Sequence, residues 1–496
     1  MSVTEIEYGM DEKSRAEGLA ALEEQARRDL ERLNFPAPSW VLPVRAPDGR
    51  VALDVLIVGA GMCGQTAAFA LMRDGVRNIR IVDRAPKGQE GPWSTYARME
   101  TLRSPKHLTG PDLGIPSLTF RAWYEAQYDR EAWESLHKPG RLDWLAYLGW
   151  VRDLVGIPVE NDTEVLSLEP DGDLIRADVR SPCGTETIHT RKVVLACGRE
   201  GSGAPRMLTF PSFDPASNNV PRRLFHSSDA IDFASLAGTR MAVLGAGASA
   251  FDNAAVALES GVAEVKMFVR RPHLPQINKS KWTSFPGFMR GFHALDDESR
   301  WRFYTYIFRE QVPPPYESVL RCDRHAGFSI RFAEGWTDVV PRSDGLTIVT
   351  SKGRYDVEAA VVATGFDVDL VQRAELKAFR DHVLVWGDRV SADAAQAHPE
   401  AARFPYLGDG MQLLEKIPGS CPQLTNLHVF NWGVTMSHGA LAGDIPGLGI
   451  GATRLAQALV RDLFVKDAPR HFANLQAHDD SELKPTRYFI PPDQRR

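Results

Sequence analysis

The stretch "LDVLIVGAGMCGQTAAFALMRDGVRNIRIVD", residues 53–83, decides the fold class of this chain. An apolar run leads into the pattern G-x-G-x-x-G at Gly59, Gly61 and Gly64, followed by a helix pattern and a second apolar run ending at Asp83. This order predicts a βαβ unit that binds a dinucleotide, with the pyrophosphate against the glycines. Asp83 is expected to accept a ribose hydroxyl, and its neighbour Arg84 is also a cofactor-binding candidate.

A second glycine turn lies in "VLGAGASAFD", residues 243–252, with Gly245, Gly247 and then Ser249 and Ala250, the alanine standing in the third glycine's place. The next apolar run ends in Arg270 and Arg271 where the first unit has an acid. A guanidinium can hold a 2′-phosphate that a carboxylate would repel. We therefore expect FAD in the first unit and NADPH in the second, the alternative being that both arginines are solvated surface charges.

These units predict an α/β fold with two Rossmann-like domains, the NADPH domain inserted in the FAD domain, and an N-terminal helical extension. The periodic leucines of residues 11–34 indicate a helix docked on the main body. Residues 356–366, "DVEAAVVATGF", form an apolar strand pattern assigned to the returning first domain. The expected ranges are 1–50 for the extension and linker, 51–205 and 346–496 for the FAD domain, and 206–345 for the NADPH domain, which carries an aromatic insertion.

Composition narrows the classes of partner. The net charge of −6 and the absence of long basic runs argue against nucleic acid, and no apolar run reaches the ~18 residues of a membrane span. Five scattered cysteines and thirteen histidines show no metal-ligand spacing, so no metal is expected. Scattered cysteines and an acidic N-terminus favour the cytoplasm. Homo-oligomerisation stays open.

Four short segments carry a family resemblance: "GPWSTYAR" (91–98), "LFHSSDAIDF" (224–233), "FVRRPH" (268–273) and "VVATGFDVDL" (361–370). Together with the two glycine turns, they resemble motifs of the class B flavoprotein monooxygenases. This family includes flavin-containing monooxygenases, N-hydroxylases and Baeyer–Villiger monooxygenases. The resemblance implies cofactor contacts for Trp93, Thr364 and Gly365, and a domain-supporting role for His226.

The resemblance also implies the reaction. NADPH reduces FAD, the reduced flavin traps O₂ as a C4a-(hydro)peroxide, and one oxygen atom passes to a small organic substrate. N-oxygenation, S-oxygenation, Baeyer–Villiger insertion and ring hydroxylation all stay open. "LRSPK" (102–106) resembles the family segment beside the reactive flavin edge, so Arg103 and Ser104 are the catalytic candidates.

Two other functions compete with this interpretation. A non-oxygenating flavin reductase of the disulfide-reductase type would use the same two nucleotide units, but it needs a C-x-x-C or C-x₄-C pair that the sequence lacks. A non-enzymatic, redox-sensing flavoprotein would be reduced once and stop. Three features are left open: Asn431 and Asp444 as flavin contacts, and the aromatic stripe of Trp301, Tyr304 and Phe308 as core or pocket wall.

Overall fold

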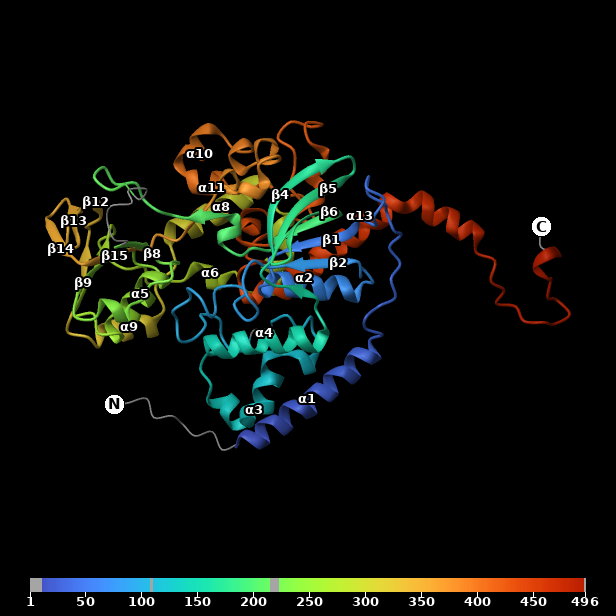
Figure 1. The fold of residues 1–496 in the computed structure, drawn as a ribbon, viewed down its shortest axis with the longest axis horizontal. Helices are drawn as coiled ribbons and strands as arrows, with labels where there is room; N and C mark the ends of the chain where they lie inside the picture. The colour runs from blue at the N-terminus through green and yellow to red at the C-terminus, as the bar shows by residue number, and fades with distance from the viewer. Residues whose placement is uncertain (1–10, 108–109, 215–222, 495–496) are drawn as a thin grey trace.

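The computed structural model describes residues 11–107, 110–214 and 223–494. Figure 1 shows two α/β bodies, each built on its own sheet, with an N-terminal helical layer beneath the larger one. This confirms the predicted fold class. The acidic N-terminal segment 1–10 and residues 215–222 of the expected crossing linker lie outside the described residues.

The first sheet has the strand order β3-β2-β1-β6-β5-β4, with β17 beside β6. Its strands β3, β2, β1, β6 and β17 pair in parallel, whereas β4, β5 and the first half of β6 form an antiparallel meander. Strand β1 is apolar from Val55 onward because it is buried on both faces, while Asp54 near its start is buried beside Arg191. The strands are β1 (Leu53–Val58), β2 (Ile79–Val82), β3 (Val159–Glu160), β4 (Glu164–Asp171), β5 (Leu174–Ser181), β6 (Gly184–Leu195) and β17 (Leu427–Val429).

The second sheet is entirely parallel, in the order β11-β10-β9-β15-β8. Strand β15 pairs with β9 and β8, so the apolar segment before Thr364 belongs to this sheet and not to the returning first domain. Residues 346–362 pack within or against the second sheet, and the return therefore comes after residue 362 rather than at 346. The strands are β8 (Leu224–His226), β9 (Arg240–Leu244), β10 (Glu264–Val269), β11 (Phe328–Phe332) and β15 (Ala359–Val362).

Two small sheets complete the strand structure. An antiparallel sheet in the order β12-β13-β14 covers the second sheet, and its apolar residues join the core around Phe268. Strands β7 and β16 pair where the chain crosses between the two bodies. The strands are β7 (Gly203–Pro205), β12 (Trp336–Pro341), β13 (Leu346–Thr350), β14 (Arg354–Val357) and β16 (Phe366–Val368).

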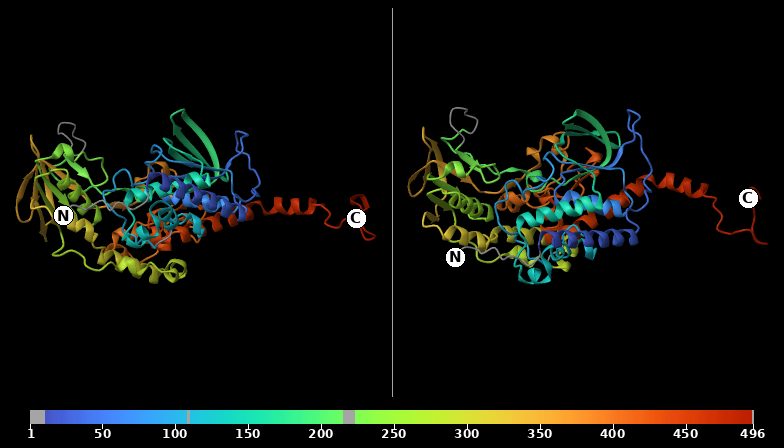
Figure 2. Two further views of the ribbon diagram at one scale, coloured as in Figure 1. Left: turned by 90° about the horizontal axis from the view of Figure 1, so that it is seen from below. Right: turned by 60° about the horizontal axis from the view of Figure 1, so that its bottom comes forward.

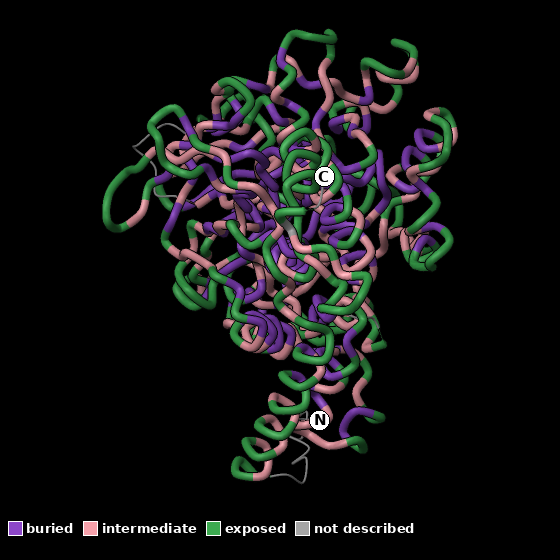
Figure 3. Tube along the Cα trace, turned by 90° about the vertical axis from the view of Figure 1, so that its right-hand side faces the viewer, coloured by how far each residue is buried: buried purple, intermediate pink, exposed green. Residues whose placement is uncertain are grey.

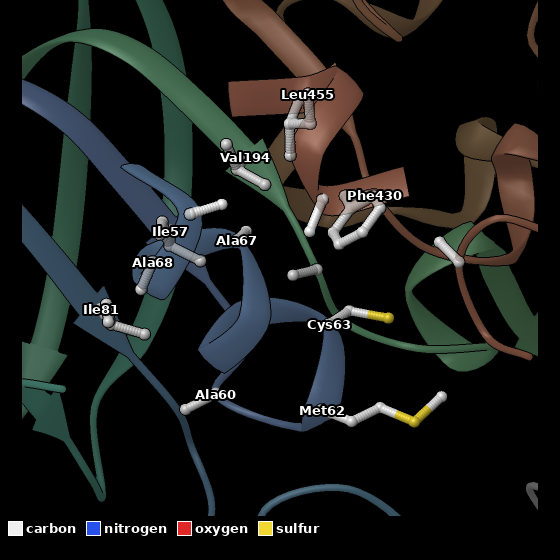
Figure 4. Close-up of a cluster of buried hydrophobic side chains, with 14 of the residues drawn as sticks. Ile57, Ala60, Met62, Cys63, Ala67, Ala68, Ile81, Val194, Phe430 and Leu455 are labelled. Atoms are coloured by element: carbon white, nitrogen blue, oxygen red, sulfur yellow. The ribbon is translucent and has the colours of Figure 1, made fainter. Parts of the chain in front are cut away.

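The main helices form where the sequence provides an apolar face that the fold can bury. Helix α2 contacts α13 and the first sheet, and Ala68 of α2 packs in one cluster with Ile57, Val194 and Leu455 (Figure 4). The helices of the larger body are α2 (Met62–Arg73), α3 (Phe120–Ser135), α4 (Arg141–Val155), α10 (Ala392–Ala397), α11 (Pro399–Ala402), α12 (Thr435–His438) and α13 (Leu448–Ala477). The second region has α5 (Ala248–Glu259), α6 (Lys279–Trp282), α7 (Pro286–Gly291), α8 (Asp297–Glu310) and α9 (Tyr316–Asp323).

The N-terminal helix α1 (Glu12–Arg32) lies along α3, as its leucine periodicity predicts, and buries Ala26 and Leu30. At the other end of the chain, the last part of α13 leaves the main body in all views (Figures 1 and 2). Residues near the C-terminus are exposed, while buried residues fill the centre of the molecule (Figure 3).

The aromatic insertion is mainly core. Trp301 and Tyr304 on α8 are buried against Trp386, Phe404 and Met436, which belong to the segment returning to the larger body. The insertion thus ties the second region to the first. No helix in the described part of the chain has the length and apolar character of a membrane span.

Two buried histidines predict acid sensitivity. Burial lowers the pKa values of His428 and His438 to about 3, and each ring shares a hydrogen bond with a backbone carbonyl oxygen, that of Gly410 and Gly408 respectively. The unfolded chain binds protons at these rings below pH ~6.5, so folding stability is lost as pH falls through that value. Each ring should lower the unfolding free energy by about 1.4 kcal/mol per pH unit.

The variant His428→Asn removes one of these titrations. We expect the difference in unfolding free energy between wild type and variant to decrease by about 2 kcal/mol when the pH is lowered from 6.5 to 5. Urea unfolding at both pH values measures this difference. If the unfolding free energies of the two proteins changed equally with pH, His428 would not be a cause of the lost stability in acid.

Candidate active site

Both glycine turns open onto one cleft with a volume of about 1710 Å³. The cleft is lined by the carboxyl ends of β1 and β9, by the first turns of α2 and α5, and by the segments 91–104, 307–312 and 443–445. Carboxyl ends of parallel strands are where α/β folds bind their ligands. The two predicted nucleotide sites are therefore parts of a single continuous site.

The first turn has the geometry of a phosphate cradle. Gly59 adopts φ +98°, and a Cβ there would lie 2.8 Å from the Ala196 carbonyl oxygen. A Cβ on Gly61 would meet nothing nearer than the Gly91 Cα atom, 3.8 Å away. Gly61 begins α2 without a side-chain cap, so the first N–H groups of the helix are available to a ligand. These residues fit a pyrophosphate.

The second turn repeats this arrangement. Gly245 has φ +134° and lies against the Ala363 carbonyl oxygen, while a Cβ on Gly247 would have no neighbour within 4 Å. Gly247 begins α5, again without a side-chain cap. The open space over both helix starts fits two dinucleotides that approach from opposite walls of the cleft.

Most of the predicted site residues line this cleft. The lining includes Gly59, Gly61, Asp83, Arg84, Trp93, Arg103, Ser104, Gly245, Gly247, Ser249, Arg270, Arg271, Thr364 and Gly365. Gly64 and Ala250 are absent from the lining and serve packing. A Cβ on Gly64 would lie 1.9 Å from the Gly59 carbonyl oxygen, whereas Ala250 is fully buried in the second core.

Asp83 has a structural task that the sequence did not reveal. One carboxylate oxygen accepts the Ala60 N–H at 2.7 Å, and the other accepts the Ala85 N–H at 2.8 Å. Burial raises the pKa of this carboxyl. Asp83 therefore braces the first glycine turn, and a ribose hydroxyl would have to share its oxygens. Arg84 pairs with Glu200 at 2.8 Å.

The two arginines after β10 are exposed at the far end of the cleft. Arg271 donates to the Arg309 carbonyl oxygen at 2.8 Å, and the Arg270 side chain lies over Gly335. Neither arginine forms an ion pair within the described residues. Both charges can therefore serve a phosphate.

Three predicted residues lie beside the cleft. The His226 ring contacts the Ser228 hydroxyl at 2.7 Å and the Gly365 carbonyl oxygen at 2.9 Å, so it is held as a structural histidine. The Thr364 hydroxyl donates to the Arg206 carbonyl oxygen at 2.5 Å. Trp93 is buried at the cleft wall, and its Nε1–H has no partner in the described residues.

Arg98 is a bridge that sequence reasoning missed, although it ends the quoted segment 91–98. Its guanidinium donates to the Ser227 and Asp229 carbonyl oxygens, both at 2.7 Å. Its own carbonyl accepts from Arg321, which also pairs with Glu259 on α5. These contacts fix the distance between the two glycine turns.

Charged side chains meet in the middle of the cleft. Arg103 comes from the first body and interacts electrostatically with Asp444 and with Asp252 of α5. Burial raises the pKa of both carboxyls, while the cationic charge of Arg103 opposes the rise in each. Asp252 lies seven residues after Gly245, at the end of the segment 243–252 that contains the second glycine turn. Its place in that segment was the only sign of it in the sequence.

Asn431 is not exposed to this cleft. Its amide oxygen accepts from the Ser202 hydroxyl at 2.8 Å and from the Gly433 N–H at 2.9 Å, and its amide nitrogen donates to the Leu195 carbonyl oxygen. All of its polar atoms are engaged in holding β6 and the following loop. Of the two residues left open as flavin contacts, only Asp444 lines the cleft.

Known proteins resemble this chain over most of its length. The model of the pyridine nucleotide-disulphide oxidoreductase family matches residues 56–286. The FAD-dependent urate hydroxylase of Xanthomonas campestris pv. campestris is 39% identical over 468 residues, which is 94% of this chain and 97% of the relative. The chain belongs to the class B flavoprotein monooxygenases.

Solved structures of class B monooxygenases share the architecture. The ornithine N-hydroxylase of Kutzneria sp. 744, solved with reduced FAD, NADP⁺ and L-ornithine, has a TM-score of 0.64 at 17% identity, covering 83% of this chain and 99% of its own. The ornithine hydroxylase of Pseudomonas aeruginosa has a TM-score of 0.65 at 17% identity, with 83% and 100% covered. The expected pair of cofactors, FAD and NADPH, agrees with these relatives.

The cysteines of this class B monooxygenase do not form a redox pair. All five are free. Cys63 and Cys197 line the cleft, and burial raises the pKa of each thiol to about 12. A disulfide reductase needs a reactive thiolate, which these environments disfavour.

Proposed function

We propose that this monooxygenase hydroxylates a ring carbon of urate or a closely related oxopurine, using FAD and NADPH. One observation carries the proposal: the relative that is 39% identical over nearly all of its length is named a urate hydroxylase. The amine hydroxylases share only 17% of their residues with this chain, so their substrates carry no weight here. Ring hydroxylation is thereby favoured over N- or S-oxygenation and Baeyer–Villiger insertion.

The residues of the first turn would hold FAD. Gly61 and the uncapped start of α2 would receive the pyrophosphate, and Asp83 would share an oxygen with the ribose. Trp93 offers an unpartnered N–H at the same wall. The chemistry that FAD supplies when bound and reduced is the activation of O₂.

The residues of the second turn would hold NADPH. Gly247 and the start of α5 would receive its pyrophosphate, with Ser249 beside it, and Arg270 and Arg271 would clasp the 2′-phosphate. The contacts of Arg98 and His226 keep the two turns at a fixed separation. Both dinucleotides would therefore be held in one cleft.

Buried apolar side chains also line the cleft and reduce its contact with water, namely Met62, Leu102, Ile307 and Ile445. Exclusion of water protects reactive oxygen species from wasteful breakdown and strengthens the field of the nearby charges. Arg103 and Ser104 lie beside this apolar stretch and are proposed to assist oxygen transfer.

A substrate panel tests the proposed function. Purified holoenzyme is mixed with NADPH and, in separate reactions, with urate, L-ornithine and L-lysine, while NADPH loss and peroxide release are recorded together. We expect urate alone to accelerate NADPH oxidation while peroxide release falls, since coupled oxygen goes into the product. Acceleration by an amine with no effect of urate would overturn the substrate assignment.

A further inference from the structure

The cleft is also lined by polar and aromatic residues to which neither nucleotide site has been assigned. Arg103, Trp432 and Asp444 come from the larger body, and Phe308 and Gln311 come from the end of α8. These five residues, here called the central seat, line the same cleft as the two glycine turns, where a substrate can reach both cofactors.

Arg103 is anchored by one nitrogen only. Its Nη2 donates to the Pro313 carbonyl oxygen at 2.7 Å, and its other N–H groups have no hydrogen-bond partner among the described residues. Burial lowers the pKa of this guanidinium, while the carboxylates Asp444 and Asp252 oppose the shift. A fixed guanidinium with free donors suits an anionic or carbonyl oxygen.

Asp444 follows Gly443, which has φ +88°, and projects into the cleft next to Ile445. Its carboxylate accepts no hydrogen bond from the described residues. Arg199 and Arg103 are the cations that face it, and the thiol of Cys63 and the phenol of Tyr304 are the other titratable groups around it. A half-buried acceptor of this kind suits the N–H of a ligand.

Flat surfaces complete the central seat. The Arg199 guanidinium lies 3.9 Å from the centre of the Trp432 ring, which fixes that indole at the cleft wall. Gln311 ends α8 with φ +63° and ψ 171°, a strained conformation for a residue with a side chain, and Phe308 lies one turn earlier. Strain of this type is often retained where it places a group for binding.

We propose that the central seat binds the oxopurine, with Arg103 donating to a ring carbonyl oxygen and Asp444 accepting a ring N–H. Asp444 then takes the proton of that nitrogen during hydroxylation. This inference rests on the proposed function. Oxopurines alternate carbonyl acceptors and N–H donors on a flat bicycle, so a guanidinium donor, a carboxylate acceptor and aromatic side chains suit these groups.

The proton transfer balances the reaction. The electron pair of the ring C=C bond attacks one oxygen atom of the dioxygen that NADPH has reduced by two electrons, so the new C–O bond forms as the O–O bond breaks. The lone pair of the adjacent nitrogen then forms a C=N bond. That nitrogen loses its proton to the Asp444 carboxylate. The second oxygen atom of O₂ leaves as water with the two electrons of NADPH.

Three variants test the assignment: Arg103→Met, Arg103→Lys and Asp444→Asn. We expect Arg103→Met to raise KM for urate by about tenfold or more, because a charge-assisted hydrogen bond is lost. In Arg103→Lys, KM should return part of the way to the wild-type value. We expect Asp444→Asn to lower kcat with urate by about 100-fold, the usual contribution of a general base. Wild-type kcat should fall as acid protonates Asp444, and this acidic limb should be missing in Asp444→Asn.

Flavin content and anaerobic urate binding, followed by the flavin spectrum, separate these roles from a structural one. Unchanged KM in Arg103→Met, a retained acidic limb in Asp444→Asn, or loss of flavin from Asp444→Asn would each overturn the proposal. Failure of wild-type enzyme to use urate would instead overturn the proposed function, so the two failures are distinguishable.

Discussion

The variant Gly61→Val is expected to fold and to be isolated without flavin. Gly61 has φ −67° and ψ −170°, a conformation that valine adopts readily, so the backbone imposes no strain. The added side chain would enter open space at the start of α2, where the pyrophosphate must approach the helix N–H groups. Flavin content is measured from the visible spectrum of the purified protein, and folding from its circular dichroism.

Gly247→Val is the matched variant in the second turn. Gly247 has φ −86°, and a Cβ added there would have no neighbour within 4 Å, so the same substitution fills only the second cradle. We expect this protein to be yellow but reduced by NADPH about 100-fold more slowly at low donor concentration. A yellow Gly61→Val protein, or a colourless Gly247→Val protein, would show that the two sites are assigned to the wrong turns.

The double substitution of Arg270 and Arg271 by alanine should raise KM for NADPH by about tenfold or more. These guanidiniums provide exposed positive charge at the far end of the second site, and neither is neutralised by an ion pair in the described residues. NADH lacks the 2′-phosphate, so its KM should change much less. Steady-state kinetics with both donors at constant ionic strength gives the comparison.

Arg331→Ala is the control for the loss of charge. Arg331 is exposed on β11 of the same sheet but is absent from the cleft lining. It should leave both KM values within about twofold of wild type. Equal losses for NADPH and NADH in the double variant would refute the 2′-phosphate assignment.

The sequence was sufficient for the parts of this molecule that obey local rules. The G-x-G-x-x-G pattern at Gly59 fixes a turn, a helix start and a packing contact within a few residues, and all three are present. The repeated phrase at Gly245 behaves in the same way. Such motifs are predictable because the turn and the helix start are local and the positive φ of Gly59 and Gly245 favours glycine, whatever distant residue lies against them.

Long-range pairing was less predictable. Strand β15 has the pattern of a buried parallel strand, and nothing in a continuous apolar run says which of two parallel sheets it joins. The order of the chain favours the first sheet, and the strand lies in the second. For a similar reason, the sequence does not decide whether Trp301 and Tyr304 belong to the core or line a pocket. Periodicity shows that a helix face is buried but not which residues cover it.

The sequence singled out Arg103, Phe308 and Asp444 for separate reasons but could not show that they line one site. The motif resemblance points to Arg103 and Ser104, but Gln311 and Asp444 belong to segments far from them along the chain, and neither lies in a motif. Folding brings them to one cleft. Asp83 illustrates the opposite case, because its position is predictable and its bonds to the Ala60 and Ala85 amides are not.

Anaerobic titration of the purified enzyme with NADPH tests the central claim most directly. If the two glycine turns hold a flavin and a hydride donor in one cleft, the yellow colour bleaches with stoichiometric NADPH and returns when air is admitted. Readmission of air with urate present should then yield hydroxylated urate and little peroxide. A colourless protein, or a yellow one that NADPH leaves unbleached, would contradict the account.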